Sequence, residues 1–208
     1  GTVAAKGGGS ENKTKMAMLN PSDSIADWVV KTLPSMGAGW CPPGMLGIGI
    51  GGTAEKAGVL AKESLMDPVN IQELMDRGPE NAEEELRLEI FERVNKLGIG
   101  AQGLGGLTTV VDVKINAVPT HAASKPVVMI PNCAATRHVH FHLNGSGPAD
   151  LTPPKLEEWP DITWEVGEDV RRVNVDGLTK ADISEWKTGE TVLLSGTILT
   201  LYLINIRR

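Results

Sequence analysis

The sequence has few cysteines, few aromatic residues and no excess of basic charge. Its 208 residues include two cysteines and only 4% aromatic residues. The formal net charge is −6 and no basic block stands out, so nucleic acid is not an expected partner. No apolar run approaches the roughly 20 residues of a membrane-spanning helix, and the first residues lack the pattern of a signal peptide. We therefore expect a cytoplasmic protein that does not bind membranes.

The two cysteines, Cys41 and Cys133, lie far apart in the sequence. In a reducing compartment such residues are more often thiols or metal ligands than a disulfide. Both have a restrained setting, because Cys41 precedes two prolines and Cys133 precedes two alanines. This setting leaves room for a bulky group at each sulfur atom, although burial as a small hydrophobic side chain is the alternative. Two thiolates alone do not complete an iron–sulfur cluster, so a cluster would need a further ligand.

Hydrophobic periodicity predicts an α/β fold. Apolar residues recur at helical spacing in residues 22–33, 53–66 and 81–98, and Asn81 stands where it can cap the third helix. Strands are expected in the short apolar run around Gly47 and Gly49, and at residues 107–115, 125–135 and 137–143.

The composition changes near residue 150, where glycines and four prolines crowd into residues 144–164. Such a segment is typical of an interdomain connection. We therefore expect two domains, residues 1–150 and residues 151–208. The chain begins at Gly1 rather than at a methionine, and we interpret it as a piece of a longer protein.

Three glycines, Gly7 to Gly9, follow a short β-prone run at the start of the chain. They free the backbone to approach a ligand. Asn12, Lys13 and Thr14 follow them with amide, ammonium and hydroxyl groups. Bare backbone beside such donors suits a small anion, and a flexible loop is the alternative.

Gly47, Gly49 and Gly52 fit the pattern G-x-G-x-x-G between a strand and a helix, which is typical of a dinucleotide-binding turn. The acidic residue expected about 20 positions later would fall in MDPVNIQEL, which does not resemble the end of a strand. We favour a structural interpretation, in which the glycines let the strand and the helix pack closely.

His138, His140 and His142 alternate in the predicted strand 137–143, so they would project from one face of it. Two of them could share a metal ion, but three in a row span too far for one ion. We favour a polar strand face.

Several motifs stand in order along the chain: KGGGSENKT, GAGWCPPG, GIGGTAEKA, LGIGAQGLGG, PTHAAS, IPNCAATRH and LSGTILT. Together they resemble those of the class I, iron–sulfur-dependent fumarate hydratases, a family that includes tartrate dehydratases. The resemblance implies most of a cluster-binding N-terminal domain, followed by the truncated start of a smaller C-terminal domain.

The resemblance also implies a cofactor, a 4Fe-4S cluster held by three cysteines with one iron open for substrate. Cys41 and Cys133 match the second and third of these cysteines, and the first would precede Gly1. The family's substrate-binding segment matches Gly9, Asn12, Lys13 and Thr14. The active-site histidine of the family matches His121, which would orient the substrate or shuttle a proton.

The implied activity is the reversible hydration of fumarate to malate, both of which are small dicarboxylates. The open iron of the cluster would act as a Lewis acid, and the full-length enzyme would be a homodimer. Dehydration of tartrate by the same chemistry is the alternative within the family. A non-catalytic module that binds a dinucleotide or a metal is the alternative outside it. From Leu201 the chain departs from the family pattern. The resemblance implies that the first cluster cysteine, the arginine after LSGTILT and the rest of the second domain are missing, so we expect negligible activity from this chain alone. Lys125 also departs from that pattern, where a small or apolar residue is expected.

Overall fold

The structure is a computed structural model that describes residues 2–149, 155, 157, 167, 168, 170–187 and 190–199. Its contacts divide the chain into two compact units, Gly1–Asp150 and Leu151–Arg208. Helices and strands are mixed along the chain, which confirms the α/β fold class. Within the described residues, no helix has the length and apolar character needed to cross a membrane.

The larger unit contains a four-stranded sheet with the order β1-β4-β2-β3. Strands β2 (Gly44–Ile50), β3 (Val110–Ala117) and β4 (Lys125–Asn132) confirm three of the predicted strands. The sequence did not predict β1 (Lys15–Leu19). Lysine and alanine are depleted in strands, so this segment becomes a strand through its antiparallel pairing with β4.

The register of the sheet brings four chain segments to one end. Strand β2 runs parallel to β3 and antiparallel to β4, with Met45 opposite Asn132. Strand β1 is antiparallel to β4, with Lys15 opposite Met129. The segments that precede β1, β2 and β3 therefore meet the segment that follows β4.

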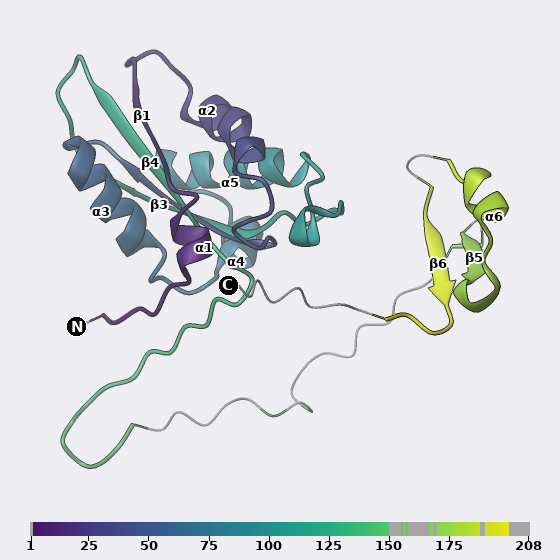
Figure 1. Cartoon of the computed structure of the whole chain (residues 1–208). Coiled ribbons are helices and arrows are strands. Elements are labelled where there is room, and N and C mark those ends of the chain that lie inside the picture. Colours follow the sequence, from purple (N-terminus) through teal and green to yellow (C-terminus); the bar gives the residue numbers. More distant parts are fainter. Residues whose placement is uncertain are drawn as a thin grey trace, which may run out of the picture. The chain divides into compact units, whose positions relative to one another are not determined.

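One face of the sheet is covered by α2 (Ile25–Thr32) and α5 (Ala82–Asn95), on the side away from α3 (Figure 1). Side-chain oxygens cap both helices, since Ser24 accepts from Asp27 N at 3.1 Å and Asn81 accepts from Glu84 N at 3.0 Å. The two predicted helices and the Asn81 cap are thus confirmed. Their apolar faces and the 3-10 helix η1 (Leu33–Met36) bury a core that includes Val29, Leu33, Trp40, Ile90, Val94, Val113, Ile115 and Met129.

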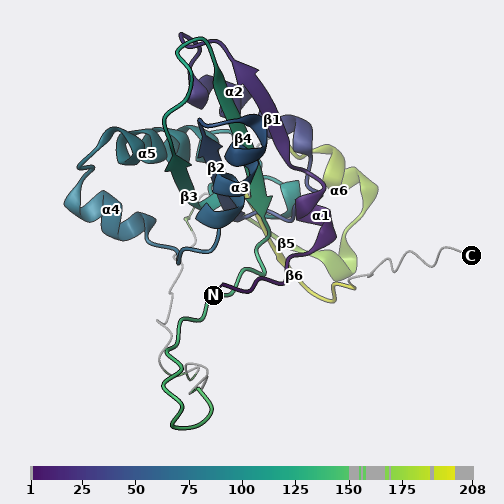
Figure 2. The ribbon, with the colours of Figure 1, turned by 90° about the vertical axis from the view of Figure 1, so that its left-hand side faces the viewer.

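The other face of the sheet is covered by α3 (Ala54–Ser64), which confirms the third predicted helix (Figures 1 and 2). It packs on β2 at the glycines of the G-x-G-x-x-G pattern. A Cβ atom on Gly47 would lie 2.3 Å from Ala61 O, and one on Gly49 would lie 1.9 Å from Ala57 O. These glycines let the helix and strand approach, so the structural interpretation of the pattern is confirmed.

Three other segments differ from the prediction. Residues 137–143 were predicted as a strand, and this was wrong: they run without regular secondary structure, and His138 Nε2 lies 2.8 Å from Leu65 O. An alternating pattern forms a strand only when a neighbour pairs with it. The β-prone start of the chain forms no strand, and its glycines enter the single helical turn α1 (Gly8–Glu11). The short helix α4 (Ile71–Arg77) was not predicted.

The smaller unit contains two parallel strands, β5 (Arg171–Asn174) and β6 (Val192–Ser195). Between them lie the 3-10 helix η4 (Val175–Gly177) and helix α6 (Lys180–Ser184). A capping box between Thr179 and Asp182 starts α6. The departure from the family pattern at Leu201 lies outside the described residues.

Candidate active site

The two cysteines meet at the shared end of the sheet. Cys41 lies just before β2, and Cys133 follows directly after β4. Ala134 N donates to Cys41 O at 3.0 Å, so the two segments are joined by a backbone hydrogen bond. Both cysteines are free, Cys41 is exposed and Cys133 is half-buried. The structure thus places two thiols that are far apart in sequence on neighbouring segments.

The backbone is strained at this end of the sheet. Cys41 has φ +57° and Gln102 has φ +55°, and they are the only non-glycine residues with positive φ in the described part of the chain. They lie close together, because Pro42, the residue after Cys41, accepts at its O atom from Gln102 N at 2.7 Å and from Gln102 Nε2 at 3.3 Å. Strain of this kind concentrates at functional sites, where the surrounding structure holds it in place.

The turn α1 packs against the segment that carries Cys41. A Cβ atom on Gly9 would lie 3.0 Å from Gly39 O. A Cβ atom on Gly39 would lie 2.7 Å from Lys13 Cε and 3.3 Å from its Nζ, so the lysine side chain crosses this glycine. The structure therefore brings Gly9 and Lys13 next to the loop that carries Cys41.

Two other residues of the predicted substrate segment, Asn12 and Thr14, directly follow α1. Asn12 is exposed, and its backbone N donates to Gly8 O at 2.9 Å. The hydroxyl of Thr14 donates to Glu11 O at 2.7 Å, and the side chain is half-buried. The contact of Thr14 supports the turn itself.

Lys6 is a residue of this site that the sequence analysis did not single out. Its Nζ donates to Ser10 Oγ at 2.8 Å and lies 3.2 Å from Glu11 Oε2. Burial lowers the pKa of the Lys6 ammonium, whereas its contact with Glu11 and the nearby Cys133 act in the opposite direction. The signal in the sequence was its position directly before the three glycines, inside the motif KGGGSENKT.

The structure does not bring His121 to the cysteines of the same chain. His121 lies in the turn between the end of β3 and the start of β4, at the other end of the sheet. The seven residues of β2 separate the two ends of the sheet, and a strand of this length spans about 20 Å. In that turn His121 Nδ1 accepts from Ala123 N at 3.1 Å.

The three histidines of residues 137–143 are not gathered around one point in the described part of the chain. Within the described ranges, no group of three or more His, Cys, Asp or Glu residues is placed to hold a metal ion. Lys125, where the sequence departs from the family pattern, donates from Nζ to Asp23 O at 2.7 Å. This contact lies at the start of β4, away from the cysteines.

Comparisons with known proteins agree on one family. Residues 2–142 match the family described as fumarate hydratase (Fumerase), and residues 145–202 match the one described as fumarase C-terminus. The chain is 42% identical over 135 residues to a putative L(+)-tartrate dehydratase subunit alpha of Methanocaldococcus jannaschii, covering 64% of this chain and 46% of that protein.

Two relatives from Escherichia coli strain K12 are similar as well. The anaerobic class I fumarate hydratase is 30% identical over 216 residues, which cover 94% of this chain and 38% of the relative. The L(+)-tartrate dehydratase subunit alpha is 33% identical over 138 residues, which cover 65% of this chain and 44% of the relative. The chain thus spans less than half the length of these relatives.

Proposed function

The chain belongs to the fumarate hydratase family, and on that premise we propose that it forms part of a hydro-lyase that hydrates fumarate reversibly to malate. The observation that carries the proposal is the pair of free thiols at one end of the sheet. Beside this pair lies the turn with Gly9 and Lys13, which offers backbone and an ammonium group to an anion.

The two thiols fit part of a cluster-binding set. Thiolates are the usual ligands of iron–sulfur clusters, and the Ala134–Cys41 hydrogen bond keeps the two segments together. No third metal-binding side chain joins them among the described residues. We assign Cys41 and Cys133 as two ligands of a 4Fe-4S cluster, which supplies a Lewis acid when it is bound.

The remaining residues of the turn would bind the substrate. Lys13 is half-buried against Gly39, so its ammonium can pair with the carboxylate remote from the reacting carbons. The backbone of Gly9 and the exposed amide of Asn12 add polar groups on the same turn. Thr14 and Lys6 hold this turn through their contacts with Glu11.

The assignment of His121 stays a prediction. Within one chain this histidine lies about 20 Å from the cysteines, because the full length of β2 separates them. A role for it beside the thiols would therefore need the His121 of a second copy, as in the predicted homodimer. An imidazole can orient a carboxylate or move a proton near neutral pH.

Tartrate is the second candidate substrate. The identity of 42% to a putative tartrate dehydratase subunit favours it, because this value exceeds the 30% to the fumarate hydratase. Both reactions remove or add water beside a carboxylate, and the turn residues above suit either. A dinucleotide module is disfavoured, because the backbone of α3 fills the space next to Gly47 and Gly49.

Anaerobic reconstitution with iron and sulfide tests the proposal. The full-length protein is expected to take up iron and sulfide and to gain the visible absorption of a cluster. Cys41→Ser and Cys133→Ser are each expected to abolish this, because a hydroxyl holds iron poorly in place of a thiolate. His140→Gln is the matched control, since it removes an exposed potential ligand and leaves both thiols.

A colourless full-length wild-type protein, or full colour in either of its serine variants, would contradict the cluster assignment. Turnover is measured with malate and with tartrate in the full-length protein, with and without each serine substitution. The substrate with the higher kcat/KM decides between the two candidates. We expect the 208-residue chain alone to have negligible turnover. Its two thiols are only part of a cluster-binding set, and catalytic groups that act as a unit lose most of their activity when one of them is missing.

A further inference from the structure

A second site lies beside the edge strand β3, and the proposed hydration chemistry uses none of its residues. It is a pocket of about 480 Å³. Its lining residues come from β3, from α5, and from α4 with the segment that enters it. Those that matter here are Asp67, Asn70, Glu73, Arg87 and Lys114. The pocket therefore combines charged side chains from three parts of the larger unit.

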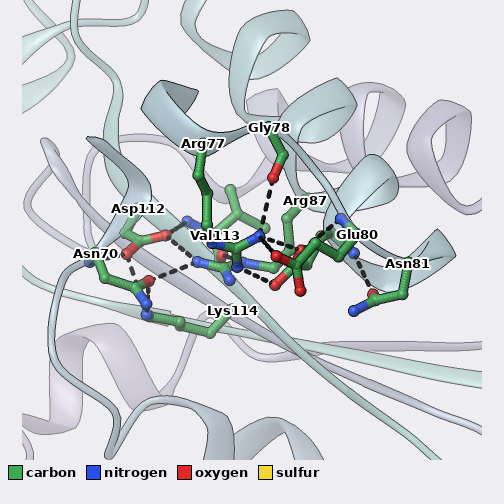
Figure 3. Close-up of polar contacts among 10 residues, drawn as sticks. Asn70, Arg77, Gly78, Glu80, Asn81, Arg87, Asp112, Val113 and Lys114 are labelled. Atoms are coloured by element: carbon green, nitrogen blue, oxygen red, sulfur yellow. Dashed lines mark hydrogen bonds and ion pairs between the residues drawn. The ribbon is translucent and has the colours of Figure 1, made fainter. Parts of the chain in front are cut away.

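Its inner wall is built on one buried carboxylate. The side chain of Asp112 is fully buried, and it accepts from Asn70 N at 2.8 Å and from Arg87 Nη2 at 3.1 Å. Lys114 Nζ lies 3.3 Å from the same carboxylate and also donates to Asn70 Oδ1. Figure 3 shows these side chains pointing toward one another.

The two cations of this wall have unused donors. Arg87 donates from Nε to Val113 O at 2.6 Å and from Nη2 to Asn70 and Asp112, whereas Nη1 has no hydrogen-bond partner within the described part of the chain. The ammonium of Lys114 has three donors and contacts two acceptors. Both side chains line the pocket, so the free donors are available to a ligand there.

The charges are distributed unevenly between the wall and the rim. The wall holds two cations, with side chains 11% and 5% exposed, against the single carboxylate of Asp112. The rim holds two exposed carboxylates, Asp67 and Glu73. Burial lowers the pKa of Lys114, and Asp112 and Asp67 oppose this, so the rim charge acts on the wall. The wall thus favours an anionic group and the rim a cationic one.

We propose that this pocket binds a small zwitterion that carries a carboxylate and an ammonium group, as an amino acid does. The carboxylate accepts from Arg87 Nη1 and Lys114 Nζ, and the ammonium group lies near Asp67 and Glu73. A dianion is disfavoured, because its second negative charge is repelled by the rim carboxylates. The expected ligand therefore differs from the dicarboxylates of the proposed function. The inference does not depend on that function.

Four probes on one three-carbon frame test the charge pattern: β-alanine, propionate, malonate and propylammonium. Each is titrated into the 208-residue chain, and the backbone amide signals of Asn70, Val113 and Lys114 are followed by NMR. β-Alanine is expected to shift them saturably, with a dissociation constant on the order of 1 mM, and to bind about tenfold more tightly than the other three probes. Absence of a saturable shift, or equal binding of propionate or malonate, would overturn the proposal.

Variants at the rim keep the test independent of folding, because Asp67 and Glu73 are exposed and lie outside the buried network. The double variant Asp67→Asn with Glu73→Gln is expected to bind β-alanine about tenfold more weakly and propionate more tightly. Glu63→Gln, a change of an exposed carboxylate on α3 outside the pocket lining, is the control and should leave both affinities unchanged. Retention of the wild-type preference in the double variant would refute the assignment.

Discussion

At the scale of single residues, Gly49 of β2 sets how closely helix α3 approaches the sheet. The space that a side chain here would occupy is filled by backbone of α3, because a Cβ atom on Gly49 would lie 1.9 Å from Ala57 O and 2.6 Å from Ala61 N. Backbone cannot rotate away as the end of a flexible side chain can. A larger residue at this position must therefore move the helix.

Gly49→Ala is expected to destabilise the larger unit by about 1 to 3 kcal/mol, the usual range for overpacking of a core. The measurement is urea unfolding followed by circular dichroism. Gly58→Ala is the matched control, because a Cβ atom there meets no atom within 4 Å. Since Gly58 lies inside α3, alanine should stabilise by about 0.5 to 1 kcal/mol. Equal midpoints for the two variants would contradict the packing argument.

The candidate site also depends on single residues in uncommon conformations. Cys41 has φ +57°, and its carbonyl receives the hydrogen bond from Ala134. This geometry turns the chain so that an exposed thiol stands beside the segment of Cys133. The position of the thiol pair therefore follows from the backbone around each cysteine.

At the scale of elements, an ion pair joins the end of α4 to the start of α5. Arg77, the last residue of α4, donates from Nη1 to Glu84 Oε2 at 2.9 Å. Glu84 lies in the first turn of α5, and it also accepts from Glu80 N at 2.8 Å. The contact with Arg77 and the bond from Glu80 lower the pKa of Glu84 from its ordinary value of 4.5 to about 2.

This pKa predicts how the contact depends on pH. The unfolded chain binds the proton of Glu84 at higher pH than the folded chain does. The stabilisation by Glu84 is therefore complete above about pH 4.5 and is lost as the pH falls toward 2. Glu84→Gln should lower the urea midpoint at pH 7, and its difference from wild type should shrink as the pH is lowered to 3.

Glu83→Gln, in the same first turn of α5, is the control for the helix terminus. Glu83 forms no ion pair with the residues that the structure describes, so its substitution should give a smaller change at pH 7. High salt should also reduce the effect of Glu84→Gln, because the pair is exposed to screening. A difference between wild type and Glu84→Gln that grows on acidification would refute the assigned pKa direction.

At the scale of the whole molecule, the two units have separate secondary structure. The buried apolar residues of both core clusters lie between Ala26 and Ile130, within the larger unit. The described residues of the smaller unit form the short parallel strands β5 and β6, the 3-10 helix η4 and the short helix α6. The larger unit thus contains the hydrophobic burial that stabilises its own fold.

Deletion of residues 151–208 is therefore expected to leave the larger unit folded. Its free energy of unfolding should match that of the full chain within about 0.5 kcal/mol, as for independent changes. The comparison uses urea unfolding and the amide NMR spectrum of residues 1–150. Loss of cooperative unfolding after the deletion would show that the smaller unit is needed for the fold.

The sequence by itself determined the elements whose signals are local. The periodicity of residues 81–98 and the cap at Asn81 predicted α5, and the β-branched run before Ile115 predicted β3. The ordered motifs also identified the family that the comparisons show. Such features are visible in sequence because neighbouring residues decide them.

Only the tertiary structure decided which of these residues meet. Strand β1 exists because β4 pairs with it, whereas residues 137–143 form no strand and pair with no strand among the residues that the structure describes. The direction of β4 places Cys133 beside Cys41 and leaves His121 at the other end of the sheet. The contacts of Lys6 and the pocket at Lys114 also join distant segments. Pairing and packing depend on residues far apart along the chain, and local patterns do not contain that information.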